Sequence, residues 1–165
     1  MERDNEIREA EIAVPPPVAD DAGLVFIGRI RTPWTSRLDC PRQGRLDGPL
    51  CEIELFQPWM YALKGIEAFK RIEVLYWLHE SRRDLVLQSP ANGGQLHGAF
   101  ALRTPVRPNP IGTSIATLFR RSGLILYVRG LDCLDGTPLI DLKPDRAFFP
   151  TDHPRTTERV SDRIA

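Results

Sequence analysis

The stretch Gly112 to Asp132, GTSIATLFRRSGLILYVRGLD, decides the fold class of this chain. Each half is rich in β-branched and aliphatic residues, and the Ser-Gly pair between the halves is typical of a tight turn. We therefore predict a β-hairpin with strands at 112–121 and 124–132. The residues that follow, DGTP at 135–138, predict a second turn that leads into a last short strand, LIDLKP at 139–144.

Upstream of the hairpin, apolar runs alternate with segments rich in proline and glycine. Segment 33–50 has the composition of a long loop, and segment 57–69 predicts a helical turn or two. We predict four further strands: about Leu24 to Arg31, CEIELF at 51–56, RIEVLYWLHES at 71–81 and GAFALRT at 98–104. About seven strands with little helix predict a mainly β fold, an antiparallel sheet rolled into a barrel or a sandwich.

The composition is typical of one globular domain with tails. The chain has 165 residues, of which 42% are hydrophobic and 27% charged, and this length suffices for one sizeable core. We predict a flexible acidic and proline-rich leader at 1–22, a β-barrel domain at 23–150 and a C-terminal tail at 151–165. No apolar run approaches the roughly 20 residues of a membrane span, and the N-terminus has no signal-peptide features, so we expect a cytoplasmic protein.

The sequence lacks the common marks of metal and phosphate chemistry. The three cysteines have no CxxC spacing, which predicts free thiols, and the three histidines have no metal-ligand spacing, so we expect no metal. The motifs GxGxxG, GxxxxGK[ST], HExxH and GxSxG are absent. Their absence argues against a dinucleotide fold, a phosphate loop, a zinc protease and a serine hydrolase.

Charge is distributed unevenly along a chain whose formal net charge is zero. Residues 1–21 hold seven acids and two arginines; subtracting them from the totals of 22 acids and 22 bases leaves 15 acids and 20 bases in the remainder. All but three of the basic residues are arginine, whose planar guanidinium pairs with phosphate through two hydrogen bonds. This composition permits an RNA partner without identifying one.

A proline-rich segment, VRPNPIG at 106–112, comes directly before the hairpin. Each proline fixes its own φ and favours extended geometry in the residue before it, so Arg107 and Asn109 are both held extended. Because proline has no N–H, the segment does not fit a central strand. We predict a stiff surface segment that presents Arg107 and Asn109, either to water or to a ligand.

Four blocks of the sequence resemble the TsaA-like, or TrmO, family in order and spacing. They are PRQG at 41–44, ALKGIEAFKRIEVLYWLHES at 62–81, GAFALRTPVRPNPIGTS at 98–114 and LDCLDGTPLIDLKPD at 131–145. The pairing of RPNPIG with LDxxDGTPxxDxKP is the most specific part. The resemblance covers about residues 24–150.

Members of this family are transfer RNA methyltransferases that use S-adenosylmethionine to methylate N6 of threonylcarbamoyladenosine beside the anticodon. The resemblance implies a β-barrel without Rossmann architecture, S-adenosylmethionine as cofactor, tRNA as substrate, and a homodimer with the cofactor site near the subunit interface. Methylation of another RNA or of a small molecule, and a regulatory S-adenosylmethionine-binding module without catalysis, stay open as alternatives. Longer members continue beyond the barrel, so the resemblance bears more directly on the cofactor than on the substrate.

The resemblance and the residue chemistry together select candidate site residues. Guanidinium, amide and carboxylate groups suit the carboxylate, adenine, ammonium and ribose of the cofactor, and Gly136 allows a close backbone approach. Taken alone, Asp135 is more simply a turn former. The cofactor-binding candidates are Arg42, Gln43, Arg107, Asn109, Asp132, Asp135, Gly136 and Thr137.

Candidates for the other roles are fewer. Arg103 and Lys143 are candidates for RNA contact, although Lys143 could equally form a solvated ion pair with Asp141 two residues away on the same strand face. His79 matches a histidine of the family block and is the candidate catalytic residue, with a satisfied structural histidine as the alternative. A proton acceptor would help because the attacking nitrogen belongs to a urea-like group of low nucleophilicity.

Overall fold

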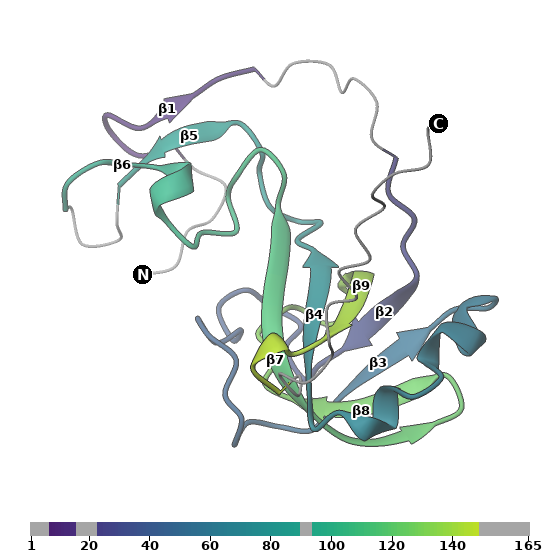
Figure 1. Ribbon diagram of the computed structural model, residues 1–165. Coiled ribbons are helices and arrows are strands. Elements are labelled where there is room, and N and C mark those ends of the chain that lie inside the picture. The colour runs from purple at the N-terminus through teal and green to yellow at the C-terminus, as the bar shows by residue number, and fades with distance from the viewer. Residues whose placement is uncertain (1–6, 16–22, 90–93, 149–165) are drawn as a thin grey trace, which may run out of the picture.

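Six strands form a closed antiparallel barrel in this structure, a computed structural model that describes residues 7–15, 23–89 and 94–148. Neighbouring strands around the barrel follow the order β2-β3-β8-β7-β4-β9 (Figure 1). Their bounds are β2 Gly28–Arg31, β3 Cys51–Leu55, β4 Arg71–Trp77, β7 Ile111–Ser122, β8 Ile125–Arg129 and β9 Pro138–Pro144. The prediction of a mainly β fold built on an antiparallel sheet is confirmed, and the sheet is a barrel.

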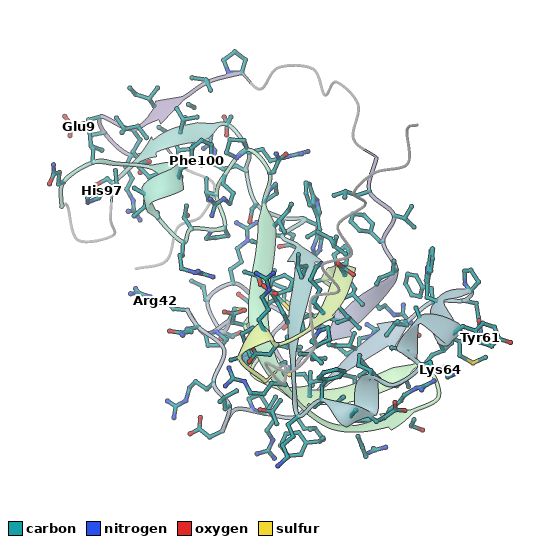
Figure 2. The ribbon with its side chains drawn as sticks, viewed as in Figure 1. Glu9, Arg42, Tyr61, Lys64, His97 and Phe100 are labelled. Carbon is teal, nitrogen blue, oxygen red and sulfur yellow. The ribbon has the colours of Figure 1, made fainter. Side chains whose placement is uncertain are left out.

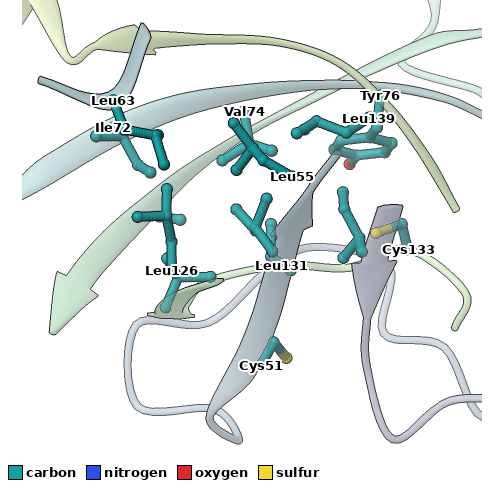
Figure 3. Packing of buried hydrophobic residues seen from close by; sticks show 14 residues of the cluster. Cys51, Leu55, Leu63, Ile72, Val74, Tyr76, Leu126, Leu131, Cys133 and Leu139 are labelled. Carbon is teal, nitrogen blue, oxygen red and sulfur yellow. The ribbon is translucent and has the colours of Figure 1, made fainter. Parts of the chain in front are cut away.

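Alternation of inward apolar and outward polar residues produces these strands. Along β4, Ile72, Val74 and Tyr76 are buried while the residues between them are partly exposed. Strands β3 and β8 show the same period of two, which is the repeat of a strand with one buried face. The inward residues of all six strands pack into one core (Figure 3), and its largest fully buried members include Ile30, Ile53, Ile72, Leu126 and Leu139.

The predicted hairpin is confirmed. Strands β7 and β8 pair antiparallel, and the tight turn between them contains Gly123 with φ of 60°. The helical turns predicted in 57–69 are also present as two short 3-10 helices, η1 (Trp59–Leu63) and η2 (Ile66–Ala68). A further 3-10 helix, η4 (Arg146–Phe148), follows β9.

The first barrel strand is shorter than predicted. Pairing begins at Gly28, and the apolar residues Leu24, Val25 and Phe26 are exposed. Strand β3, the partner of β2, ends at Leu55, and Ile27 is the residue before β2 that still forms backbone hydrogen bonds, with Leu139 and Phe56. An apolar run forms a strand only where a partner strand runs beside it. Composition alone therefore predicted too long a strand here.

The predicted strand at 98–104 is wrong. Only His97–Gly98 (β6) pairs with a neighbouring strand, and the chain then turns through the 3-10 helix η3 (Ala99–Ala101). Strand β6 joins β5 (Leu85–Gln88) and β1 (Ile12–Ala13) in a small sheet with the order β1-β5-β6, beside the barrel (Figure 1). Sequence reasoning missed β5, although its Leu-Val-Leu run carried an apolar signal.

The leader and the tail fall largely outside the described residues. Of the predicted leader, residues 7–15 are described and contain β1, which pairs with β5. The predicted tail at 151–165, with His153, lies outside the described residues. Among the helices of the described ranges, none is long and apolar enough to cross a membrane.

The three cysteines carry free thiols, as predicted. Burial raises the pKa of the Cys51 thiol to about 11, and burial together with the charge of Asp132 raises the pKa of Cys133 further. Both thiols therefore stay protonated at neutral pH and behave as small core residues. In the described parts of the chain, no group of three or more histidine, cysteine or acidic side chains is placed to hold a metal ion.

Candidate functional site at one end of the barrel

Three connections between barrel strands meet at one end of the barrel. The antiparallel register places the ends of β2, β4 and β8 beside the starts of β3, β7 and β9. The connections are residues 32–50, 78–110 and 130–137, and together they contain every residue predicted to bind a cofactor. Arg42, in the first connection, lies on the side of the barrel away from Tyr61 and Lys64 (Figure 2).

The loop that carries Arg42 and Gln43 is attached to the third connection through Asp132. The backbone N–H of Gly44 donates to Oδ2 of Asp132 over 3.1 Å, and Sγ of Cys40 donates to the Asp132 carbonyl over 2.9 Å. Gly44 also packs directly on Gly130, since a Cβ on Gly44 would lie only 1.8 Å from the Gly130 carbonyl oxygen. Both Arg42 and Gln43 are exposed. The backbone beside them is therefore fixed while their side chains face solvent.

The Asp132 carboxylate is in turn held from inside the barrel. Its Oδ1 accepts hydrogen bonds from the hydroxyl of Tyr76 over 2.5 Å and from Oγ of Ser114 over 2.7 Å, and the two hydroxyls lie 2.8 Å apart. Burial and the nearby Asp132 charge raise the pKa of Tyr76 far above its ordinary value. Tyr76 therefore remains a donor, and Asp132 links the barrel interior to the Gly44 loop.

Sequence reasoning missed Tyr76 and Ser114, which come from neighbouring strands. Tyr76 faces Gly112 across the β4–β7 pair, and a Cβ on Gly112 would lie 2.1 Å from the tyrosine ring. Glycine at this position therefore makes room for the ring. The available signal was the inward position of a tyrosine in the alternating run RIEVLYW, because a buried hydroxyl needs a hydrogen-bond partner.

The segment 106–110 is fixed by its carbonyl groups. The Val106 carbonyl accepts from Nε2 of Gln88 over 2.7 Å, and Gln88 is only 3% exposed. The Pro108 carbonyl accepts from Nε of Arg83 over 3.2 Å, and the Pro110 carbonyl accepts from the backbone N–H of Leu78 over 2.8 Å. The segment is irregular, as its prolines predicted, and the structure adds that its carbonyl groups anchor it.

This anchoring leaves two polar side chains for other contacts. Arg107 is half-buried and Asn109 is exposed, and neither side chain has a hydrogen bond or ion pair among the described residues. Arg83, which holds Pro108, lies with its guanidinium carbon 4.9 Å from the centre of the Trp77 ring. The segment thus combines a fixed backbone with uncommitted guanidinium and amide groups.

The turn at 135–137 leads from β8 into β9 and is bonded to the end of β2. The Asp135 carboxylate accepts from the Thr32 N–H over 3.1 Å and lies 3.4 Å from Nη1 of Arg31. Gly136 has a φ of 78°, a left-handed conformation suited to glycine, and its N–H donates to the Ile30 carbonyl over 2.8 Å. Thr137 is 1% exposed. Asp135 is therefore bonded to the end of β2, while the Thr137 N–H donates to the Leu134 carbonyl over 3.2 Å and the Thr137 carbonyl accepts from the Ile30 N–H over 2.8 Å.

The remaining candidates differ in position. His79 follows β4 at the same barrel end, where its Nε2 lies 3.9 Å from Oε1 of the adjacent Glu80, and Arg103 is exposed in the same connection. Lys143 instead pairs in register with Glu73, toward the opposite end, and its ammonium contacts the Asp141 carboxylate. His79 thus lies at this end of the barrel, Arg103 lies just after η3 in the connection that carries the small sheet, and Lys143 lies apart in an exposed ion pair.

The groups at this barrel end suit a ligand with a carboxylate and a hydrogen-bonding base. Arg42 and Arg107 supply guanidinium groups for an anion, and Gln43 and Asn109 supply amides that both donate and accept. All four project from segments whose backbones are tied to the barrel. Such an arrangement positions a ligand at low entropic cost.

Comparison with known proteins agrees with this architecture. Residues 29–149 match the family described as tRNA-methyltransferase O N-terminal domain. The chain belongs to the TrmO family. Its barrel is also similar to the crystal structure of TrmO from Pseudomonas aeruginosa, with a TM-score of 0.64 and 28% identity over 87% of this chain and 64% of that one.

Two curated relatives show the range of TrmO family members that this chain resembles. The "Probable S-adenosyl-L-methionine-binding protein VirR" of Rhizobium radiobacter is 63% identical over 142 residues, which are 86% of this chain and 81% of that protein. The "tRNA (adenine(37)-N6)-methyltransferase" of Escherichia coli is 35% identical over 133 residues, 74% of this chain and 57% of the enzyme. The chain thus spans most of the first relative and little more than half of the second.

Proposed function

We propose that this protein is an S-adenosylmethionine-dependent methyltransferase that methylates N6 of threonylcarbamoyladenosine beside the anticodon of tRNA. The observation that carries the proposal is that the connections carrying the TrmO family segments PRQG, RPNP and DGT leave the barrel at the same end. Relatives named for S-adenosylmethionine binding and for tRNA adenine methylation support it. We assign this activity to the domain at 23–150.

The residues of this end take distinct roles in the proposal. When bound, S-adenosylmethionine supplies a methyl group on a positively charged sulfur. Arg42 and Arg107 bind anionic groups, while Gln43 and Asn109 bind polar edges of the ligand. Gly136 leaves the backbone of its turn open to close approach. Methyl transfer requires near-linear alignment of three atoms, so fixed loops contribute mainly by positioning.

Three predicted cofactor-binding residues instead hold the backbone of the neighbouring segments in place: Asp132, Asp135 and Thr137. Asp132 holds the Gly44 loop, and Asp135 holds the end of β2 through Thr32. They are therefore positioning residues in this proposal, in contrast to the direct cofactor contact predicted from the sequence. His79 accepts the proton of the attacking nitrogen in this proposal, with water as the final acceptor. Arg103 contacts the RNA, and Lys143 stays a candidate RNA contact, although its ammonium is bonded to the Asp141 carboxylate.

The proposal includes a homodimer in the cytoplasm. The homodimer, with the cofactor site near its interface, rests on the family resemblance alone. Phe100, which is 82% exposed on η3 (Figure 2), is an apolar side chain that such an interface would cover. A tRNA substrate places the protein in the cytoplasm.

Calorimetric titration with S-adenosylmethionine and S-adenosylhomocysteine, followed by transfer of labelled methyl to tRNA, tests the proposed function. We expect saturable binding of both ligands and label in the nucleoside next to the anticodon. Absence of binding at millimolar ligand, with and without tRNA, would rule out the cofactor. Binding without transfer to tRNA purified from a strain that lacks this protein would rule out the activity.

Replacing Asn109 with alanine is expected to weaken S-adenosylmethionine binding about tenfold, because a hydrogen-bonding amide is lost from the ligand contact. The midpoint of thermal unfolding should stay the same, since Asn109 is exposed and its side chain has no hydrogen-bond partner among the described residues. Calorimetry and a thermal scan measure the two effects. Wild-type affinity in this variant would remove Asn109 from the site.

A second candidate function is a regulatory S-adenosylmethionine-binding module without catalysis. The observation that favours it is coverage: the chain spans 81% of a relative named only for S-adenosylmethionine binding and 57% of a named methyltransferase. Methylation of another RNA or of a small molecule is the remaining enzymatic alternative. Tight cofactor binding with no transfer to any cellular RNA pool would favour the regulatory module.

A further inference from the structure

A bulge displaces one aromatic residue from the outer wall of the barrel. In the β7–β8 pair, Leu118 faces Val128 and Arg120 faces Tyr127, so Phe119 has no partner on β8. This two-against-one pattern is a β-bulge, which commonly redirects a side chain. Phe119 is 55% exposed. A phenylalanine is therefore exposed to solvent within a hairpin whose strands are paired on both sides of it.

Two arginines lie against aromatic rings on the same outer face. Leu126 and Val128 point into the core, so Tyr127 and Arg129 point outward. The guanidinium carbon of Arg120 lies 3.4 Å from the centre of the Tyr127 ring, and that of Arg129 lies 5.1 Å from the centre of the Phe119 ring. We call Phe119, Arg120, Tyr127 and Arg129 the β7–β8 track.

The two arginines of the track are not neutralised by acids. Neither forms a salt bridge among the described residues. The nearby Arg121 and Arg45 are instead bonded to Glu67 and Asp47. The acid that lies nearest in register is Glu52, which faces Tyr127 from β3. The track therefore offers two positive charges that form no salt bridge among the described residues, with the carboxylates of Glu52 and Asp47 nearby.

The track is continuous with the candidate site. Arg129 leads directly into Gly130, on which Gly44 packs. The hydrogen bond from Arg45 and, more weakly, the charge of Arg129 lower the pKa of Asp47, which places Arg129 near the 32–50 connection. A chain bound at this end of the barrel can thus continue past Arg129 onto the outer face of β8.

We propose that the β7–β8 track binds the tRNA next to the reacting nucleoside, with a base stacked on Phe119 and phosphates paired with Arg120 and Arg129. The proposal rests on the proposed function for the identity of the RNA. Alternating aromatic and cationic side chains are the features that bind nucleic acid bases and backbone. Arginine stacked on tyrosine retains its N–H groups for phosphate.

Affinity for unfractionated bacterial tRNA, measured by fluorescence anisotropy at several salt concentrations, tests the track. Phe119→Ala should weaken binding about tenfold with little change in the salt dependence, because it removes the stacking ring and leaves both guanidinium groups in place. Arg120→Ala should weaken binding and lower the slope of log affinity against log salt by about one, because one phosphate contact is lost. Glu52→Gln should strengthen binding, because it removes the opposing charge.

The exposed residues Tyr61 and Lys64 provide a matched control, because Tyr61→Ala and Lys64→Ala remove an aromatic and a cation outside the track. Both controls should bind tRNA as the wild type does, and every variant should bind S-adenosylmethionine normally. Wild-type tRNA affinity in Phe119→Ala and Arg120→Ala, or equal losses in the controls, would overturn the track. If the wild type still methylates tRNA, the proposed function stands; a wild type that neither binds nor methylates tRNA overturns both.

Discussion

Replacing Asp132 with alanine is expected to weaken S-adenosylmethionine binding by about tenfold or more and to lower the free energy of unfolding by about 3 kcal/mol. The carboxylate accepts bonds from Tyr76, Ser114 and the Gly44 N–H. Without it, two hydroxyls inside the barrel and one loop N–H lose their acceptor. Calorimetry at a temperature where the variant is folded measures the affinity, and chemical unfolding measures the stability.

Asp132→Asn separates the two effects. Its amide oxygen can still accept from Tyr76 and Ser114, but its NH₂ group then faces the Gly44 N–H, so the anchor of the loop is lost. We expect a smaller loss of stability than in Asp132→Ala with a similar loss of affinity. If affinity instead followed stability in the two variants, Asp132 would be a core residue without influence on the loop.

Tyr76→Phe distinguishes positioning from direct contact with the cofactor. It removes one bond to Asp132 without altering the loop side of the carboxylate. Positioning predicts that S-adenosylmethionine binding weakens several-fold in this variant, because Asp132 is held less firmly. Unchanged affinity in Tyr76→Phe, together with a large loss in Asp132→Ala, would mean that Asp132 binds the cofactor itself.

The strands could be predicted from the sequence because they carry a local signal, whereas the choice of a barrel over a sandwich came from the family resemblance. Alternation in segments such as RIEVLYW marks the buried face, and the Ser-Gly pair marks the hairpin. The failures at 24–27 and 98–104 have a common cause. Apolar composition does not tell whether a partner strand runs alongside, and at both places the partner ends or the chain turns.

The candidate site also could be predicted only where its features depend on neighbouring residues in the sequence. The stiffness of RPNP follows from two prolines, and its loop conformation was predicted from them. The role of Asp132 was not, because its partners Tyr76 and Gly44 lie 56 and 88 residues away in the chain. Contacts between residues so far apart in the chain produce no recognisable pattern in the local sequence. The roles of Arg42, Gln43, Arg107 and Asn109 in binding stay predictions.

Gly44→Ala is expected to abolish measurable S-adenosylmethionine binding at concentrations that saturate the wild type. A Cβ at this position would lie 1.8 Å from the Gly130 carbonyl oxygen and 2.5 Å from its carbonyl carbon. Both are backbone atoms and cannot rotate aside, so the loop must lift away and break the Gly44–Asp132 bond. Arg42 and Gln43 move with it, and overpacking lowers the free energy of unfolding by about 1–3 kcal/mol.

Gly98→Ala is the matched control for this substitution. Gly98 has a φ of −62°, and no atom lies within 4 Å of the position that a Cβ would take there. Alanine at this position should leave affinity unchanged and stability equal or slightly higher, since it restricts the unfolded chain. Calorimetry on both variants decides the point: if Gly44→Ala binds as Gly98→Ala does, contact between the 41–44 loop and Gly130 does not build the site. Loss in Gly44→Ala alone, with the variant still folded, places the site on that contact.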